Sequence, residues 1–244
     1  MPCYKSKKYL RKAVKYILTQ DYSNFEVIVT SDADPENSIQ EIQNIKDHRL
    51  KVVELSKNVG RYAIDHSVVD SCKSDYFVPI DSDDWCNKSF LSTLIKITEK
   101  YKTLDVVFSA QKFSTGQTKS PKKWDRTDTF KHHAGQAALW RREFLLEMNL
   151  TNPNFRVGWD SIMTSVPWLF GNVGVNHTPL YNVVRREGSL TSSKETGFGT
   201  PYRRKVQRYL AQLWKDIVKN KDDREAIKCL LLQSRKEIIH EEVS

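Results

Sequence analysis

The spacing of hydrophobic residues near the start of the chain predicts a helix followed by a strand. Five hydrophobic residues recur at the intervals of one buried helical face: Leu10, Ala13, Val14, Ile17 and Leu18. Ser6 is a suitable N-cap in front of them. Residues 25–30 then form a short β-branched run, which the polar loop 31–34 closes, so this run reads as a strand.

The alternation of helices and strands continues along the first half of the chain. Pro35, which follows Asp34 as a cap, predicts a helix to about residue 45. The later hydrophobic runs predict a strand at 52–55, a helix after Gly60, a strand at 76–80, a helix at 90–101 and a strand at 106–108. Strands separated by single helices imply right-handed crossovers. We therefore predict an α/β fold with a mostly parallel central sheet flanked by helices.

The second half is less regular and ends in helices. Residues 111–130 are polar, basic and rich in turn-forming residues, which indicates an internal boundary. A hydrophobic stripe near the end predicts an amphipathic helix through Val206, Tyr209, Leu210, Leu213, Trp214 and Ile217. We expect three parts: residues 1–110, residues 111–195, and a helical C-terminal extension over residues 196–244.

The charge and cysteine content of the chain indicate which kind of partner and which cellular compartment to expect. The chain carries 39 Lys and Arg against 30 Asp and Glu, a net charge of +9, which favours an anionic partner. The four cysteines are scattered, so a reducing, cytoplasmic compartment is expected. We find neither a signal peptide nor a run of roughly 18 to 20 apolar residues. Contact with a membrane would therefore be peripheral.

The acidic run Asp81-Ser82-Asp83-Asp84 follows a predicted strand directly. Its carboxylates would repel one another unless a cation lay among them. Mn²⁺ or Mg²⁺ bound by one or two carboxylates usually completes its shell with phosphate oxygens, which points to a diphosphate substrate. The alternative is a solvated acidic turn that caps the helix near Asn87. Spacing alone leaves both interpretations open.

Several segments, taken in order, resemble family 2 glycosyltransferases with the GT-A fold. They are Pro2-Cys3-Tyr4, the helix at 10–18, Asp21-Tyr22 with the strand at 25–29, Asn58-Val59-Gly60, and the stretch 76–85 that ends in the acidic run. The match covers about the first 100 residues, and an ordered set of segments is more specific than a lone D-x-D. It implies that residues 1–110 bind a nucleotide-sugar donor and residues 111–195 the acceptor.

The resemblance also implies roles for single residues. Asp32 would read the base, Asp81 would face the ribose and Asp83 would hold the metal, with Asp81 and His177 as further metal ligands. The implied donor site consists of Pro2, Tyr4, Asp32, Asn58, Arg61, Asp81, Ser82, Asp83 and Arg185. Arg185 or Arg186 would neutralise the leaving diphosphate. Asp32 as an N-cap or turn residue, and His177 as a structural histidine, remain open alternatives.

The likeness thins in the second half. Residues 132–142 resemble the acceptor-side strand of the family, and Gly158-Trp159-Asp160 stands where the family has its Glu-Asp motif. Asp160 is therefore the candidate general base, which would take the proton of the acceptor hydroxyl. The alternative is that Asp160 caps a helix that begins near Ser161.

Two departures from the family pattern affect the donor site. The family has an apolar strand before the proline, whereas the numbering here starts at Met1, so the first strand is expected to be missing or a stub. The family's Arg-Asn pair is replaced by Asp65-His66. Arg61 or Lys57 could supply the missing basic contact.

The resemblance implies a metal-dependent, inverting transfer from a UDP-sugar to a glycan or other hydroxyl acceptor, with Mn²⁺ or Mg²⁺. The alternative is a non-catalytic nucleotide-sugar-binding module, motivated by the two departures. The net charge also suggests nucleic acid, but acidic loops at the expected ligand edge argue against it. The basic start of the C-terminal helices, Arg203 to Arg208, either contacts an anionic membrane or is a solvated helix face.

Overall fold

The computed structural model describes residues 1–121, 137–186 and 188–237 of the 244-residue chain. A parallel three-stranded sheet forms its first half, in the order β1-β2-β3: β1 (Pro2–Cys3), β2 (Val27–Asp32) and β3 (Leu50–Leu55). Pro2 pairs with Thr30, and Val27 pairs with Leu50. All three strands run the same way, so the end of β2 brings Asp32 to the carboxyl edge of the sheet.

A second, mixed sheet follows, in the order β4-β8-β6-β9-β5 with β7 paired to β6. Its strands are β4 (Tyr76–Phe77), β5 (Trp85–Cys86), β6 (Val106–Phe113), β7 (Thr118–Lys119), β8 (Ala138–Arg141) and β9 (Val173–Val183). Within it β6 and β9 are parallel, whereas the other pairs are antiparallel. The α/β class is as predicted, but the expected single, mostly parallel sheet is divided into two.

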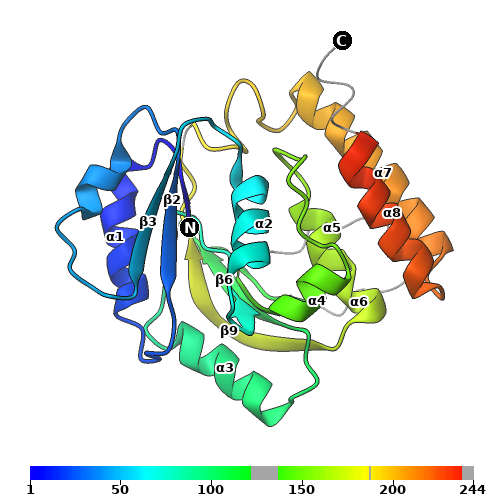
Figure 1. Cartoon of the computed structure of the whole chain (residues 1–244), viewed down its shortest axis with the longest axis horizontal. Coiled ribbons are helices and arrows are strands. Elements are labelled where there is room, and N and C mark those ends of the chain that lie inside the picture. Colours follow the sequence, from blue (N-terminus) through cyan, green and yellow to red (C-terminus); the bar gives the residue numbers. More distant parts are fainter. Residues whose placement is uncertain (122–136, 187, 238–244) are drawn as a thin grey trace.

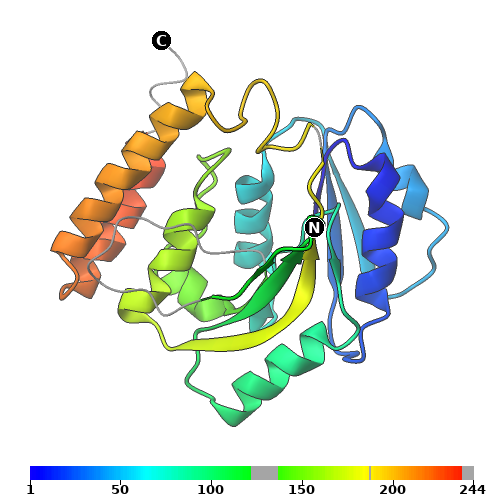
Figure 2. The ribbon, with the colours of Figure 1, turned by 180° about the vertical axis from the view of Figure 1, so that it is seen from behind.

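Helices cover both sheets, as Figures 1 and 2 show from opposite sides. They are α1 (Lys7–Leu18), the short 3₁₀ helix η1 (Ser38–Ile42), α2 (Arg61–Ser71), α3 (Phe90–Lys100), α4 (Arg142–Glu147), α5 (Asp160–Ser165), α6 (Pro167–Phe170), α7 (Pro201–Lys219) and α8 (Arg224–Glu237). In both views α1 lies at one end of the molecule and the α7–α8 pair at the other, with α2 between them. None of the described helices is long and apolar enough to cross a membrane.

Two hydrophobic clusters stabilise this arrangement. One buries the apolar face of α1 against β2 and α3, through residues such as Leu10, Val29 and Phe90. The other joins α2, α4 and α5 to the C-terminal helices, through residues such as Trp140 and Trp214. The stripe predicted on α7 is the face that this second cluster buries. The C-terminal helices therefore share a core with the elements that carry Asp160.

One predicted helix is wrong. Instead of a helix from Pro35 to about residue 45, the chain forms only η1. The Asp34 carboxylate accepts the backbone N–H groups of Lys5, Glu36 and Ser38, at 2.8, 3.2 and 3.0 Å. Asn37 adopts a left-handed backbone conformation with φ 49°. Both features favour a closed turn over a continuous helix.

The first strand, β1, has two residues. The strand predicted at 76–80 is shorter, because β4 ends at Phe77 and residues 78–84 form the acidic loop. The acceptor-side segment predicted over residues 132–142 falls partly outside the described residues, which resume at residue 137.

Candidate functional site

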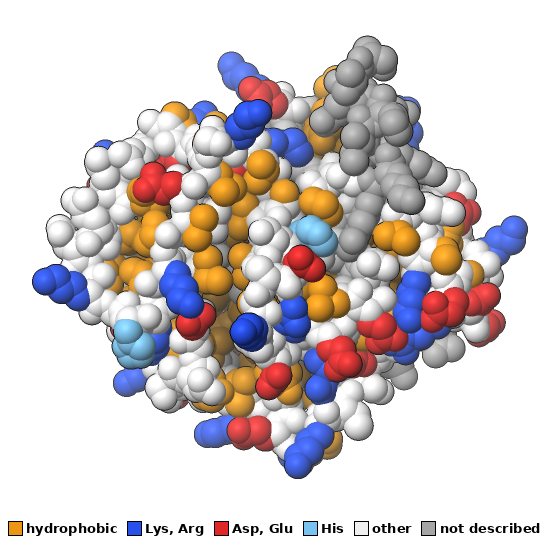
Figure 3. All heavy atoms as spheres, in the orientation of Figure 1, with side chains coloured by type: hydrophobic (Ala, Val, Ile, Leu, Met, Phe, Trp, Pro, Cys, Tyr) orange, Lys and Arg blue, Asp and Glu red, His pale blue; other side chains and the backbone are white. Residues whose placement is uncertain are grey.

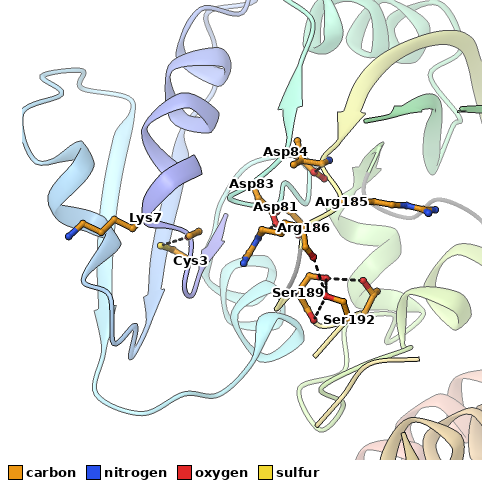
Figure 4. A network of polar contacts seen from close by, with 12 residues as sticks. Cys3, Lys7, Asp81, Asp83, Asp84, Arg185, Arg186, Ser189 and Ser192 are labelled. Atoms are coloured by element: carbon orange, nitrogen blue, oxygen red, sulfur yellow. Dashed lines mark hydrogen bonds and ion pairs between the residues drawn. The ribbon is translucent and has the colours of Figure 1, made fainter. Parts of the chain in front are cut away.

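Three carboxylates gather in the loop between β4 and β5. One oxygen from each of Asp81, Asp83 and Asp84 lies within 4.8 Å of the others. Figure 4 shows these side chains beside β1 and the segment that follows β9. Ser82 between them is 5% exposed. The short β5, which pairs with the end of β9, holds the far side of this loop in place.

Two arginines from different elements bind this cluster. Arg61, at the start of α2, donates from Nη1 to Asp81 Oδ1 at 2.5 Å and from Nη2 to Asp65 at 3.2 Å. Arg186 donates from Nε to Asp83 Oδ2 at 2.5 Å. Arg61 thus places a basic side chain beside the acidic loop, and its replacement of the family's Arg-Asn pair in donor binding stays a prediction. Asp65 is the carboxylate that holds Arg61 from the other side.

Asp84, the third carboxylate of the cluster, is buried beside two other negative charges. Burial, followed by the charges of Asp81 and Asp83, raises the pKa of Asp84 to about 8. Burial and the charge of Asp81 also raise the pKa of Asp83, although Arg186 opposes the shift. Asp84 Oδ1 accepts the Val184 N–H at 2.8 Å, which ties the acidic loop to the end of β9.

This raised pKa predicts a pH-dependent stability of the metal-free protein. The pKa of Asp84 rises from the ordinary 3.8 to about 8 on folding, so the folded state binds a proton that the unfolded state releases. The free energy of unfolding should therefore fall as the pH rises from about 4 to 8. Urea denaturation in EDTA should show a shallower fall for Asp84→Asn. An equal slope for both proteins would contradict the shift.

Asp32 ends β2 and is bound to backbone groups. Its carboxylate is 4% exposed and accepts the N–H groups of Val59 and Gly60 at 2.7 and 2.9 Å. The Asn58 amide donates to Asp32 O at 2.9 Å. These bonds build the turn that starts α2, the structural role held open for Asp32. Its reading of a base stays a prediction.

Asp160 begins α5 and faces α2. Tyr62 donates from its hydroxyl to Asp160 Oδ1 at 2.9 Å and accepts the Asp160 N–H at 3.3 Å. Burial and the nearby Asp160 charge hold the pKa of Tyr62 well above its usual value. Consecutive residues of α2, Arg61 and Tyr62, therefore contact the acidic loop and the candidate base. Sequence reasoning missed Tyr62, although its position beside Arg61 was a usable signal.

The loop after β9 closes the site from the C-terminal side. Ser192 donates to Arg186 O at 3.1 Å, a contact drawn in Figure 4. Arg203 of α7 donates to Leu190 O at 2.8 Å and to Thr196 O at 2.5 Å, and its guanidinium lies over the Phe198 ring. Arg203 is thus buried at 7% exposure and binds this loop. It is unavailable to the membrane contact considered for the start of α7.

Two candidate residues do not join the cluster. Arg185 is exposed and its guanidinium lies over the Phe113 ring, so it points away from the carboxylates in Figure 4, and Arg186 takes the expected place. His177 is exposed, and its Nδ1 lies 2.7 Å from Ser120 Oγ. The described metal-capable group comprises the three aspartates alone.

The remaining candidates surround the cluster. Pro2 lies in β1, beside Thr30 of β2, and Tyr4 is 40% exposed in the following turn. Asn58 accepts a hydrogen bond from Arg156, a residue that no sequence pattern singled out. The Arg156 guanidinium also lies against Gly60, whose φ of 85° requires a glycine at this turn.

The donor set fits a divalent cation. Three carboxylate oxygens within 4.8 Å of one another are hard ligands of the kind that Mg²⁺ and Mn²⁺ prefer. Burial, and after it the repulsion between neighbouring carboxylate charges, raises the pKa of Asp83 and that of Asp84. A bound cation would relieve the same repulsion.

The fold and the acidic loop are those expected of a GT-A glycosyltransferase. A model of the family "Glycosyl transferase family 2" matches residues 1–163, well over half of the chain. The chain belongs to glycosyl transferase family 2. GlyA of Streptococcus pneumoniae is 31% identical over 103 residues, 41% of this chain and 15% of that protein. GlyG of the same organism is 30% identical over 109 residues, 44% of this chain and 36% of that protein. The chain thus spans little more than a third of these relatives, or less.

Solved structures extend the likeness to the whole chain. S. aureus TarS 1-349 in complex with UDP-GlcNAc is similar over 100% of this chain and 72% of its own, with a TM-score of 0.73 and 20% identity. The same protein in complex with UDP is similar over 96% of this chain and 90% of its own, with a TM-score of 0.65 and 15% identity. At such identities the likeness establishes the fold, and it confirms the predicted one.

Proposed function

We propose that this chain transfers a sugar from a nucleoside diphosphate sugar, with UDP as the nucleotide, to an acceptor hydroxyl with inversion. The observation that carries the proposal is the cluster of three carboxylates between β4 and β5, two of which are bound by Arg61 and Arg186. Membership of the family and the UDP-bound state of TarS support it. Asp81, Asp83 and Asp84 would hold Mn²⁺ or Mg²⁺, which neutralises diphosphate charge when bound.

The arginines suit the departing diphosphate. A guanidinium offers paired donors to phosphate oxygens, and Arg186 already lies at the carboxylates where that group would arrive. Arg61 would instead stay with Asp65 and Asp81, because it is held from both sides. Arg186, whose only described ion pair is with Asp83, is therefore the arginine that we assign to the leaving group.

Asp160 is the proposed general base. Its Oδ1 accepts the Tyr62 hydroxyl, and the residue is only partly buried, so its other oxygen is the one that would meet an acceptor hydroxyl. A carboxylate within hydrogen-bond reach of that hydroxyl would take its proton as the oxygen attacks the anomeric carbon. Asp160 is the first residue of α5, and the N-cap position belongs to Trp159 with no side-chain cap hydrogen bond, so the capping alternative for Asp160 is wrong.

Isothermal titration tests the donor site. UDP should bind the wild type more tightly with Mn²⁺ than with EDTA, and Asp83→Asn should lose the metal-dependent part, because the variant removes one ligand and keeps the shape. GDP is the control nucleotide. Asp70→Asn, which changes an exposed carboxylate on α2, is the control variant and should bind as the wild type does.

Binding and turnover separate the two interpretations of the sequence. Metal-dependent UDP binding with release of UDP from a UDP-sugar supports the transferase. Binding without turnover against any acceptor supports the non-catalytic module. No nucleotide binding under any of these conditions rejects both.

A further inference from the structure

A strongly cationic surface covers the outer face of α1. Five exposed cations project from this helix: Lys7, Lys8, Arg11, Lys12 and Lys15. They form two rows at i, i+4 spacing, and the helix carries no acidic residue in its first turn. None of the five forms an ion pair among the residues that the structure describes. On the face shown in Figure 3, by contrast, cationic and acidic side chains are interspersed.

An open space lies along this surface. The five cations line a space of about 820 Å³ together with Tyr16, Thr19 and a single carboxylate, that of Glu41. Arg11 donates to Glu41 O at 2.6 Å, which fixes η1 as one wall. A second space of about 550 Å³ shares Tyr16 and Thr19 and continues past Trp85 to Ser89. We call the surface that lines these two spaces the α1 groove.

Aromatic rings accompany the charges. Tyr16 and Trp85 stack with their centroids 5.1 Å apart, and Lys12 lies over the Tyr16 ring. Tyr9, two turns earlier on α1, carries Arg186 over its ring at 5.5 Å. Because Arg186 also binds Asp83, the helix that lines the groove reaches the acidic cluster directly. In Figure 4 Lys7 extends away from that cluster, so its charge is not part of the proposed donor site.

We propose that the α1 groove binds a linear anionic glycan, a chain of sugars that carries phosphate or carboxylate groups. Five cations that have no ion pair among the described residues complement regularly spaced anions, and flat aromatic rings suit the apolar faces of sugars. The cations follow one another along the helix, so they suit a chain that lies along its length. The proposal stands apart from the donor site, since no groove cation contacts the carboxylates in a described ion pair.

An anionic lipid surface fits the same face less well. The apolar residues of α1, including Leu10, Val14 and Ile17, are buried in the core and have no part to insert into a bilayer. Vesicles therefore serve as the competing ligand in the test.

The test compares two fourfold variants of equal charge change. One replaces Lys8, Arg11, Lys12 and Lys15 with Gln. The matched control replaces Arg204, Arg208, Lys215 and Lys219, which are also exposed and also form two i, i+4 pairs on one helix, α7. Binding of heparin, inorganic polyphosphate and phosphatidylglycerol vesicles is measured against salt concentration, after circular dichroism has confirmed that both variants are folded.

We expect the α1 variant to bind heparin and polyphosphate at least about 10-fold more weakly at low salt, with a shallower salt dependence, while the α7 variant keeps most of its affinity. Tyr16→Leu should weaken heparin binding and leave polyphosphate binding unchanged, because only heparin has sugar rings. If both fourfold variants lost the same affinity for the polymers, net charge alone would explain binding and the proposal would be overturned. Tighter binding of vesicles than of both polymers, an unchanged Tyr16→Leu variant, or no polymer binding at low salt would overturn it as well.

Discussion

Asp160→Asn is expected to lower kcat by about 10²- to 10⁴-fold, the range that positioned proton transfer contributes. The substitution keeps the shape of the side chain and an oxygen that can accept the Tyr62 hydroxyl, so α5 should keep its place. The proton of the acceptor hydroxyl would have no carboxylate to receive it. Steady-state release of UDP, measured with an acceptor that the wild type uses, gives kcat directly.

Donor affinity separates a chemical effect from a structural one. UDP should bind Asp160→Asn with Mn²⁺ as it binds the wild type, because Asp160 contacts α2 and not the acidic cluster. Tyr62→Phe is the graded control, since it keeps the carboxylate and removes one hydrogen bond, and its loss of kcat should be smaller. A near-normal kcat in Asp160→Asn would leave Asp160 with a structural role alone, through its hydrogen bonds with Tyr62.

Arg61→Met should destabilise the protein by about 3–5 kcal/mol near neutral pH, the usual effect of leaving a buried partner charge unpaired. The Arg61 and Asp65 side chains are each 12% exposed, and they pair at 3.2 Å. Methionine fills much of the same volume, so the loss would arise from the uncompensated carboxylates of Asp65 and Asp81. Urea denaturation measures the change in the free energy of unfolding.

The pH and a double variant identify the cause. Burial raises the pKa of Asp65 and the Arg61 charge opposes this shift. Without Arg61 the pKa rises further, so the destabilisation should be smaller at pH 5 than at pH 8. Arg61→Met with Asp65→Asn should recover part of the lost stability, because the buried charge is gone. An additive double variant would show that the two residues are not coupled.

Hydrophobic periodicity was enough to predict most of the first half. The apolar face of α1 and the β-branched run before Asp32 have no other reasonable conformation, and both occur within a few residues of the predicted bounds. The helix after Pro35 was wrong because the Asp34 side chain bonds to backbone groups distant in the sequence, including Lys5. The division into two sheets also escaped prediction, since strand pairing is set by long-range contacts.

The acidic cluster was predictable because its members are adjacent in sequence and follow a strand. Its partners were harder to identify. Arg186 lies about 100 residues along the chain from Asp83 and was indistinguishable from Arg185 by sequence, since only the direction of the side chain separates them. For Asp32 the position at the end of a strand was predictable, whereas its hydrogen-bond partners were not. Its bonds to Val59 and Gly60 form only in the folded turn.

Because Arg61 and Tyr62 are adjacent, the first turn of α2 connects the acidic loop to Asp160. One side chain binds Asp81 and the next binds Asp160, so a rigid displacement of the turn moves both contacts together. A ligand that shifts Arg61 would therefore change the setting of Asp160. By linkage, a ligand at Asp160 would change the affinity at Asp81 by the same factor. Order of substrate addition would then be a property of one helical turn.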